Sequence, residues 1–375
     1  MVVALTACQP PTISKPVPQP DAVAPVVQTE KKQVPVAPPI TGVDYHPMWS
    51  SNDAATRKAI LDKYQAAGVK YVRIDIPWDK IETSGKGVYN TAEIANIDLR
   101  IKEIDDHGMK AVIMLWMAPS WATGKSSPQW PQFGLPSAQP LNPADYGDAL
   151  AWVGNRCAKT IAAVEMWNEP DEQGFWSNGS STETEADRTK AYARLIVGAY
   201  PVAKAKSPAT TFILAAPDGL GLADKYFEVL YANGIAHKYD ALAVHPYVQP
   251  SNTDPQSLTV ANDYGVWAVK RVVTLMEANG DGDKKIWATE FGFSTHKNTG
   301  AEANWDRGVT EQQQADFIKS TFTILGGVPQ VQAAFVYNDR DVNDSTTQQN
   351  GYGLLTITLT PKLGYYSLPT NTLKR

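Results

Sequence analysis

Residues 164–170 read Val-Glu-Met-Trp-Asn-Glu-Pro, a mainly apolar run that ends in an amide, a carboxyl group and a proline. The apolar residues predict a buried strand. Pro170 cannot continue a strand ladder, so Asn168 and Glu169 are expected at the carboxyl end of that strand. Residues 285–293, Lys-Ile-Trp-Ala-Thr-Glu-Phe-Gly-Phe, repeat this design around Glu290. Since an ionisable group is costly to bury, two strands that each end in a glutamate indicate a site with paired carboxyl groups.

The remaining chain alternates between strand-like and helix-like segments. Further strands are predicted at 42–46, 69–76, 110–117, 211–216, 239–247 and 331–337. Apolar residues recur at helical spacing within 53–67, 94–104, 146–157, 185–205, 223–233, 262–278 and 310–325. Eight strands alternating with helices predict a parallel α/β sheet, and a chain of this size favours a closed (β/α)₈ TIM barrel over an open doubly wound sheet. No Gly-x-Gly-x-x-Gly motif follows the first strand, which disfavours a dinucleotide-binding fold.

Composition narrows the functional classes. The chain has 375 residues and a net charge of -5, which argues against a nucleic-acid partner. It contains 11 Trp and 16 Tyr, whose flat amphipathic rings suit sugars, although most such rings in any protein pack in the core. We therefore expect one barrel domain over residues 40–375, acting as a monomer on a carbohydrate.

The beginning of the sequence resembles a lipid-attachment signal. Leu5-Thr6-Ala7-Cys8 is similar to the lipobox of bacterial lipoproteins, so Cys8 is a candidate lipidation site and residues 1–8 are interpreted as the remnant of a signal. No basic segment precedes it and seven residues are too few for a secretory apolar region, so we expect a longer natural leader. Cys157, the other cysteine, is expected to be a small buried side chain.

Residues 9–39 have the composition of a tether. They include nine prolines, no glycine and no aromatic residue, a composition that cannot build a core and favours an extended, disordered chain. A lipid anchor followed by such a linker predicts a domain held in the bacterial envelope, in the periplasm or at the cell surface, with no other contact to the membrane.

The predicted barrel places the candidate site at one end. Active sites of (β/α)₈ enzymes lie at the carboxyl ends of the strands, where the strand-to-helix loops meet. The polar and aromatic residues expected at this mouth are Arg73, Trp78, Trp116, Trp121, Asn168, Glu169, Trp176, His245, Tyr247, Glu290, Tyr337 and Asn338.

Two carboxyl groups across an aromatic mouth suit glycoside hydrolysis. One carboxylic acid protonates the leaving oxygen, while the other attacks the anomeric carbon or activates water. The separation of the two groups selects between retention and inversion, and the sequence does not give that separation.

These residues carry a family resemblance. Trp167-Asn168-Glu169-Pro170 with Thr289-Glu290-Phe291-Gly292 resembles the clan A glycoside hydrolases, which are retaining (β/α)₈ enzymes. The resemblance covers residues 42–368 and extends to Arg73, to His245-Pro246-Tyr247, and to the segments 351–355 and 361–366. Within the clan, the chain is most similar to family 39 and related enzymes, including those encoded in bacterial exopolysaccharide clusters.

The resemblance implies roles for the two carboxyl groups. Glu169 would be the general acid/base and Glu290 the nucleophile. An adjacent Arg73 would lower the pKa of Glu290, whereas an apolar wall formed by Trp167 or Trp116 would keep Glu169 protonated.

The resemblance also implies substrate contacts. Asn168 would bind the sugar 2-hydroxyl group, Tyr247 would help to keep the nucleophile ionised, and His245 would line the same pocket. Many clan members carry a tryptophan at the end of the eighth strand, where this chain has Tyr337 followed by Asn338. Tyr337 is therefore the candidate for stacking on the central sugar.

Structural alternatives exist for several candidates. Arg73 could form an ion pair with Asp75 or Asp44, and His245 could be a satisfied core histidine. The tryptophans of the long loops could pack those loops instead of sugar; these are Trp121, Trp130 and Trp176.

No cofactor or metal is expected. Residues 339–344 place oxygen ligands at alternate positions, but Asp344 and Asn350 stand where a calcium loop needs glycine and glutamate. None of the five histidines is paired at zinc spacing.

The combined expectation is a retaining glycosidase, endo-acting on a polysaccharide such as a bacterial exopolysaccharide. Two alternatives share the scaffold. In a transglycosylase, a sugar hydroxyl replaces water, and in a polysaccharide-binding barrel the two glutamates would have no catalytic role.

Overall fold

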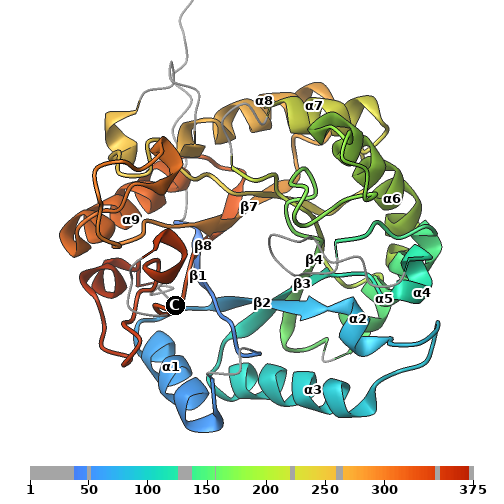
Figure 1. The fold of residues 1–375 in the computed structure, drawn as a ribbon, viewed down its shortest axis with the longest axis horizontal. Helices are drawn as coiled ribbons and strands as arrows, with labels where there is room; N and C mark the ends of the chain where they lie inside the picture. Colours follow the sequence, from blue (N-terminus) through green and yellow to red (C-terminus); the bar gives the residue numbers. More distant parts are fainter. Residues whose placement is uncertain are drawn as a thin grey trace, which may run out of the picture. The chain divides into compact units, whose positions relative to one another are not determined.

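The computed structural model describes residues 38–48, 52–125, 137–156, 158–219, 224–258, 265–342 and 347–370. In these ranges, eight parallel strands close into a barrel in chain order and helices surround it (Figure 1). The strands are β1 Ile40–Asp44, β2 Tyr71–Pro77, β3 Lys110–Trp116, β4 Ile161–Met166, β5 Phe212–Leu214, β6 Ala241–Val244, β7 Lys285–Phe291 and β8 Val331–Val336. The predicted single-domain (β/α)₈ barrel is confirmed.

Closure of the barrel depends on the pairing of its first and last strands. Gly42 in β1 pairs with Phe335 in β8 and with Tyr71 in β2, so β1 joins both edges of the sheet. A Cβ atom on Gly42 would lie 2.3 Å from the Phe335 ring, which explains why this position has no side chain.

The helices follow the strands as the sequence pattern predicts. They are α1 Ala54–Ala66, α2 Trp78–Ile81, α3 Thr91–Asp106, α4 Ser120–Thr123, α5 Pro143–Asn155, α6 Glu185–Lys206, α7 Asp224–Ala232, α8 Val269–Ala278 and α9 Glu311–Gly326. Helices α6 and α9 begin with capping boxes, in which Thr184 and Thr310 exchange hydrogen bonds with the residue three positions on. None of the helices in the described ranges combines the length and apolar content that a bilayer crossing requires.

Short 3₁₀ helices complete the loops. They are η1 Pro255–Ser257, η3 Gly265–Trp267, η4 Asn304–Asp306, η5 Gln348–Asn350 and η6 Leu363–Ser367. The segment predicted as one helix over 262–278 is η3 followed by the shorter α8.

Large and small side chains fill the amino-terminal half of the barrel interior. Tyr71, Trp287 and Phe335 stack with ring centroids 5.6 to 6.4 Å apart. Small residues from neighbouring strands, including Ala163 and Ala243, pack in the same cluster. We call the three stacked rings the barrel floor.

A charged layer lies above the barrel floor. Asp44, Arg73, Glu165 and Thr289 each follow an inward-facing residue of the lower layer by two positions, and the side-chain period of a strand is two. All four are buried, so the upper barrel interior is polar. This layer supports the mouth of the barrel.

Several sequence-based expectations lie outside the described residues. They concern Cys8, the linker 9–39 apart from its last two residues, Cys157, the loop residue Trp130, and residues 343 and 344.

Candidate active site

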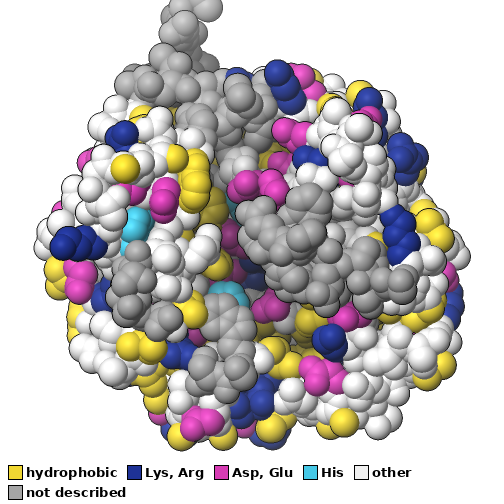
Figure 2. Space-filling view, in the orientation of Figure 1, with side chains coloured by type: hydrophobic (Ala, Val, Ile, Leu, Met, Phe, Trp, Pro, Cys, Tyr) yellow, Lys and Arg dark blue, Asp and Glu magenta, His cyan; other side chains and the backbone are white. Residues whose placement is uncertain are grey.

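A cavity of about 970 Å³ opens at the carboxyl ends of the strands. Figure 2 shows acidic side chains gathered in the hollow at the centre of this face. Seven carboxyl groups line the cavity, those of Asp44, Asp75, Glu169, Glu172, Asp218, Glu290 and Asp306. Its size is within the range of small-molecule sites in proteins.

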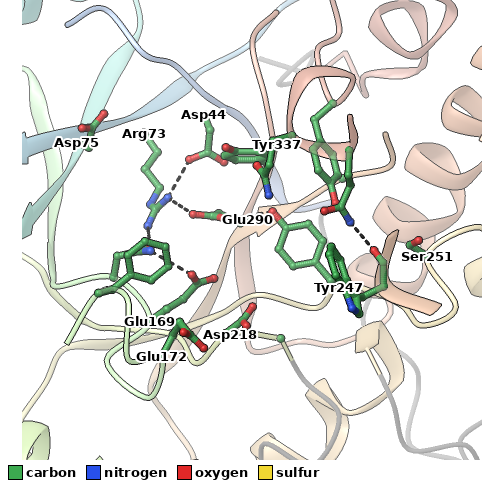
Figure 3. Close-up of a pocket in the computed structure, with 18 of the residues that line it drawn as sticks. Asp44, Arg73, Asp75, Glu169, Glu172, Asp218, Tyr247, Ser251, Glu290 and Tyr337 are labelled. Carbon is green, nitrogen blue, oxygen red and sulfur yellow. Dashed lines mark hydrogen bonds and ion pairs between the residues drawn. The ribbon is translucent and has the colours of Figure 1, made fainter. Parts of the chain in front are cut away.

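Arg73 organises the polar side chains beneath the cavity. Its Nη1 donates to Glu290 Oε1 at 2.6 Å and to Asp44 Oδ1 at 3.1 Å. Its Nε donates to Glu165 Oε2 at 2.6 Å, and its Nη2 donates to Asn168 Oδ1 at 2.9 Å. The planar guanidinium group therefore fixes residues from β1, β4 and β7 and the turn after β4 relative to one another. Figure 3 shows its contacts with Asp44 and Glu290.

The surroundings of Glu290 favour its ionised form. Burial would raise the pKa of this carboxyl group, but the positive charge of Arg73 and the hydrogen bond from the Tyr247 hydroxyl together hold it below its ordinary value. The Tyr247 hydroxyl donates to Glu290 Oε2 at 2.9 Å, so both oxygens of Glu290 accept hydrogen bonds from the protein. Such a carboxylate is ionised at neutral pH, as a nucleophile requires.

The surroundings of Glu169 favour its protonated form. Its side chain is 7% exposed, and burial followed by the negative charges of Asp218 and Glu290 raises its pKa well above the ordinary value. Asn168 Nδ2 donates to Glu169 Oε2 at 3.2 Å, and the bond from Arg73 to the Asn168 carbonyl oxygen orients that amide. Two carboxyl groups in one cavity thus have pKa values shifted in opposite directions, the usual mark of an acid and base pair.

A chain of hydrogen bonds places a proton on Glu169. Thr289 Oγ1 donates to Glu165 Oε1 at 2.9 Å, so it can only accept from His245 Nε2, which lies 3.1 Å away. Burial lowers the pKa of His245, so the ring is neutral and its Nδ1 has no proton. Glu169 Oε1 lies 2.6 Å from this Nδ1 and must therefore donate to it. This direction agrees with the raised pKa of Glu169.

The two carboxyl groups lie close enough to each other for a retaining pair. One oxygen of Glu169 and one of Glu290 lie within 4.8 Å of each other. Retaining glycosidases hold these groups about 5 to 5.5 Å apart, whereas inverting enzymes need about 6.5 to 9.5 Å to admit water.

The same atoms of Glu169, His245 and Glu290 are close enough to share a metal ion. Each of them already hydrogen-bonds within the network around Arg73 and Thr289, so the donor set is complete without an ion. The geometry suits acid and base chemistry better than metal ligation.

The backbone after β4 turns sharply to present Glu169. Trp167 and Glu169 have φ angles of 94° and 39°, in the left-handed region that side chains other than glycine seldom adopt. Such strain persists only where surrounding contacts impose it, here the buried Trp167 ring and the hydrogen bonds of Asn168 and Glu169. Pro170 directly follows, as the sequence predicts for a strand that stops at this site.

Comparison with known families identifies the chain. A family model described as Cellulase (glycosyl hydrolase family 5) matches residues 27–323. The chain belongs to this family. It is an O-glycosyl hydrolase of clan A, whose members act with retention, as its resemblance to that clan implies. No protein of curated function matches the sequence at a significant level.

Solved structures share the fold of this glycosidase. A family 39 glycoside hydrolase from Bacteroides cellulosilyticus is 19% identical with a TM-score of 0.63, over 88% of this chain and 62% of that one. The present chain thus spans about three fifths of that protein. A family 39 enzyme from Xanthomonas axonopodis pv. citri is 17% identical with a TM-score of 0.61, over 88% and 66% of the two chains.

A third similar structure contains a bound sugar. A subfamily 18 enzyme of family 5 from Bifidobacterium longum subsp. longum, in complex with Manβ1-4GlcNAc, is 14% identical with a TM-score of 0.63. The match covers 88% of this chain and 76% of that one. At these identities, the likeness of all three structures establishes the shared fold.

The structure brings most of the expected site residues of the glycosidase together. The cavity lining includes Arg73, Trp116, Asn168, Glu169, Tyr247, Glu290 and Tyr337. His245 lies directly behind it, in hydrogen-bond contact with Glu169. The open alternatives for Arg73 and His245 also have a structural answer. Arg73 pairs with Asp44 and also donates to Glu290. His245 is fully buried and also contacts Glu169 and Glu290.

Two tryptophans predicted to contact sugar lie outside the cavity. The Trp78 ring is 0% exposed and its Nε1 donates to Glu82 Oε2 at 2.6 Å. Trp121 packs edge-on against it and donates to the Glu82 carbonyl oxygen at 2.8 Å. The loops after β2 and β3 fold into α2 and α4, which place the Trp78 ring against Tyr146 of α5 and the Trp121 ring against Trp78. This corrects the expectation for both residues.

Trp176 and Asn338 also lie away from the cavity. The Trp176 ring is buried between Trp167 and Tyr192 of α6, so it packs the loop after β4. Asn338 is 0% exposed and does not line the cavity, whereas the preceding Tyr337 does. Asn338 follows the end of β8 and is buried away from the cavity, which corrects the expectation for this residue.

Sequence reasoning missed several acidic residues of the site, among them Glu165, Asp75, Glu172 and Asp218. Glu165 lies within the predicted strand 164–170. Strand alternation places it on the same inward face as the cavity residues that follow, and this pattern could have identified it. Asp75 lies within β2, two positions after Arg73 and on the same face of that strand. Glu172 and Asp218 lie in loops, where the spacing of residues along the sequence does not predict which way a side chain points.

Proposed function

We propose that this clan A glycosidase hydrolyses a polysaccharide by double displacement, with Glu290 as nucleophile and Glu169 as general acid/base. The observation that supports the proposal is the pair of opposite pKa shifts on two carboxyl groups whose oxygens lie within 4.8 Å. Separate environments for the two groups suit separate roles.

In the first step, one Glu290 oxygen attacks the anomeric carbon while the bond from that carbon to the leaving oxygen breaks. Glu169 gives its proton to the leaving oxygen, so the departing sugar leaves as a neutral alcohol. Glu290 becomes the acyl part of a glycosyl ester and Glu169 becomes a carboxylate. Loss of the negative charge on Glu290 removes one of the charges that raise the pKa of Glu169, which suits its next role as a base.

In the second step, the Glu169 carboxylate takes a proton from water, and the water oxygen attacks the anomeric carbon. The ester bond to Glu290 breaks, and the carboxylate returns to Arg73 and Tyr247. Two displacements at one carbon restore the original anomeric configuration. In both steps, Asn168 lies beside Glu169 and is proposed to bind the sugar 2-hydroxyl group.

The proposed substrate is a polysaccharide cut within the chain, and a bacterial exopolysaccharide is the specific candidate. Trp116, Phe175, Tyr247, Trp305, Tyr337 and Tyr352 supply aromatic surface around the cavity, which suits several sugar rings. One structural neighbour is described with a bound disaccharide, Manβ1-4GlcNAc.

We further propose attachment to the bacterial envelope through a lipid on Cys8, supported by the lipobox-like sequence and the proline-rich segment that follows. The test is palmitate labelling of a chain expressed behind an intact signal, with Cys8→Ser as the control. If the two chains incorporate equal label, the anchor proposal is wrong.

The catalytic proposal is tested by a screen of purified polysaccharides, with mass analysis of the products. Glu290→Gln should lower the cleavage rate by about three orders of magnitude or more while binding persists. Glu172→Gln is the matched control, because Glu172 lines the same cavity without contact to Arg73. A Glu290→Gln enzyme that cleaves at the wild-type rate would exclude Glu290 as nucleophile.

A further inference from the structure

We propose that Trp305 is a stacking platform for a distal sugar ring of a β-linked glycan chain, on the side of the cavity opposite Trp116. The inference rests on the proposed glycosidase function and extends it. It implies that the bound glycan passes over Glu169 and Glu290 and contacts the protein on both sides of the cleaved bond.

Trp305 is an exposed aromatic ring fixed at the edge of the cavity. Its side chain is 55% exposed, although it lines the cavity as part of η4. Most other tryptophans in the described ranges are buried or half-buried. A flat apolar ring that remains open to solvent beside a polar cavity offers the surface that the apolar face of a sugar needs.

Hydrogen bonds from three loops hold the backbone of η4 in place. Ser251, in the loop after β6, donates from its backbone nitrogen to the Asn304 carbonyl oxygen at 2.8 Å and accepts from Arg307 N at 2.8 Å. His296 Nε2 lies 3.1 Å from the Asp306 carbonyl oxygen. Gln348, in η5 after β8, donates to the carbonyl oxygen of Trp305 itself.

Close packing adds to this support. Gly308, just after η4, lies so close to His296 that a Cβ atom would meet the His296 carbonyl oxygen at 2.0 Å. The backbone of the platform is therefore rigid while its ring stays uncovered. A preorganised ring loses little conformational entropy when a ligand binds to it.

Trp116 forms the opposite aromatic wall. It ends β3, which lies four strands from β7 in the closed barrel and hence across the mouth from the loop that carries Trp305. Phe175 packs edge-on against it at 5.7 Å, and both line the cavity. A chain that contacts both walls must cross Glu169 and Glu290 between them.

The test compares binding across ladders of β-1,4-linked gluco-, manno- and xylo-oligosaccharides, from disaccharide to octasaccharide, by calorimetry. Wild-type affinity should rise with chain length. Trp305→Ala should weaken binding of the long members about tenfold and leave the shortest unchanged, because only a long chain reaches the platform. Trp305→Phe should restore much of the loss.

Tyr366→Ala is the matched control, since Tyr366 is an exposed aromatic residue of η6 that does not line the cavity. The platform is refuted if Trp305→Ala binds every length like the wild type, or if it weakens short and long members equally. Failure to cleave any ladder would count against the proposed hydrolysis, whereas length-dependent binding lost only in Trp305→Ala would still support the platform.

Discussion

Tyr247→Phe should shift the acid side of the pH profile without altering the shape of the cavity. The substitution removes one hydroxyl group, which donates to Glu290 Oε2 at 2.9 Å, and keeps the ring. Arg73 continues to donate to the other oxygen, Oε1, at 2.6 Å, so the variant keeps the ion pair and loses only one hydrogen bond.

The size of the shift follows from that bond. A hydrogen bond to a charged group contributes about 1.5 to 3 kcal/mol, and one pKa unit corresponds to about 1.36 kcal/mol. Loss of the Tyr247 bond should therefore raise the pKa of Glu290 by about 1 to 2 units. The proposed nucleophile acts only when ionised, so activity is lost as the pH falls through this pKa, and the acid limb should move to higher pH by the same amount.

The measurement is kcat/KM against pH on a polysaccharide that the wild-type enzyme cleaves. The basic limb should stay in place, because it reports the loss of the proton on Glu169, which Tyr247 does not contact. Tyr352→Phe is the control, since its ring lies 6.2 Å from that of Tyr247 in the same cavity and no hydrogen bond joins its hydroxyl to Glu290. An acid limb that coincides with that of the wild type would refute the account of how Glu290 is kept ionised.

Three further outcomes are expected. Glu169→Gln should slow polysaccharide cleavage by a factor of about 10² to 10⁴. It should slow cleavage of an aryl glycoside with an acidic leaving group much less, because such a group departs without a proton. Equal losses on both substrates would contradict the role of Glu169 as the acid. Thr289→Val removes the donor to buried Glu165 and should lower the free energy of unfolding by about 1 to 3 kcal/mol in denaturant titrations, with Thr289→Ser recovering most of it. Gly42→Ala places a Cβ atom 2.3 Å from the Phe335 ring and should cost about 1 to 3 kcal/mol by the same measurement, whereas an unchanged midpoint would show that the ring can move aside.

The sequence predicted the barrel and the two central glutamates because both depend on short-range patterns. Strands such as 285–293 are continuous apolar runs, since both faces of a barrel strand are buried, and their ends are marked by abrupt polar residues. The carboxyl ends of parallel strands meet at one mouth, so topology alone brings Glu169 and Glu290 together. Strand bounds differ from the prediction by a few residues, as for β6, which is Ala241–Val244 within the expected 239–247.

The sequence did not predict which way the side chains of the loops point. Trp78 and Trp116 both follow apolar strands, yet one is buried against α5 and the other lines the cavity. The difference arises because the chain turns into α2 directly after β2, which a pattern of apolar residues does not specify. Glu165 was missed for a related reason, since its partners Arg73 and Thr289 are distant in sequence and only barrel closure brings them to it.

The barrel floor has a consequence for proton exchange. Tyr71, Trp287 and Phe335 close the described barrel from below, so Glu165, Thr289 and His245 communicate with solvent through the mouth. A glycan lying across that mouth would seal the compartment for the duration of a turnover. The proton that leaves Glu169 must then return from the single water that enters after the first sugar departs. In this arrangement, the protonation state of the buried residues is set before the substrate binds. The pH of the solution therefore changes the protonation of the free enzyme more than that of the enzyme with bound glycan.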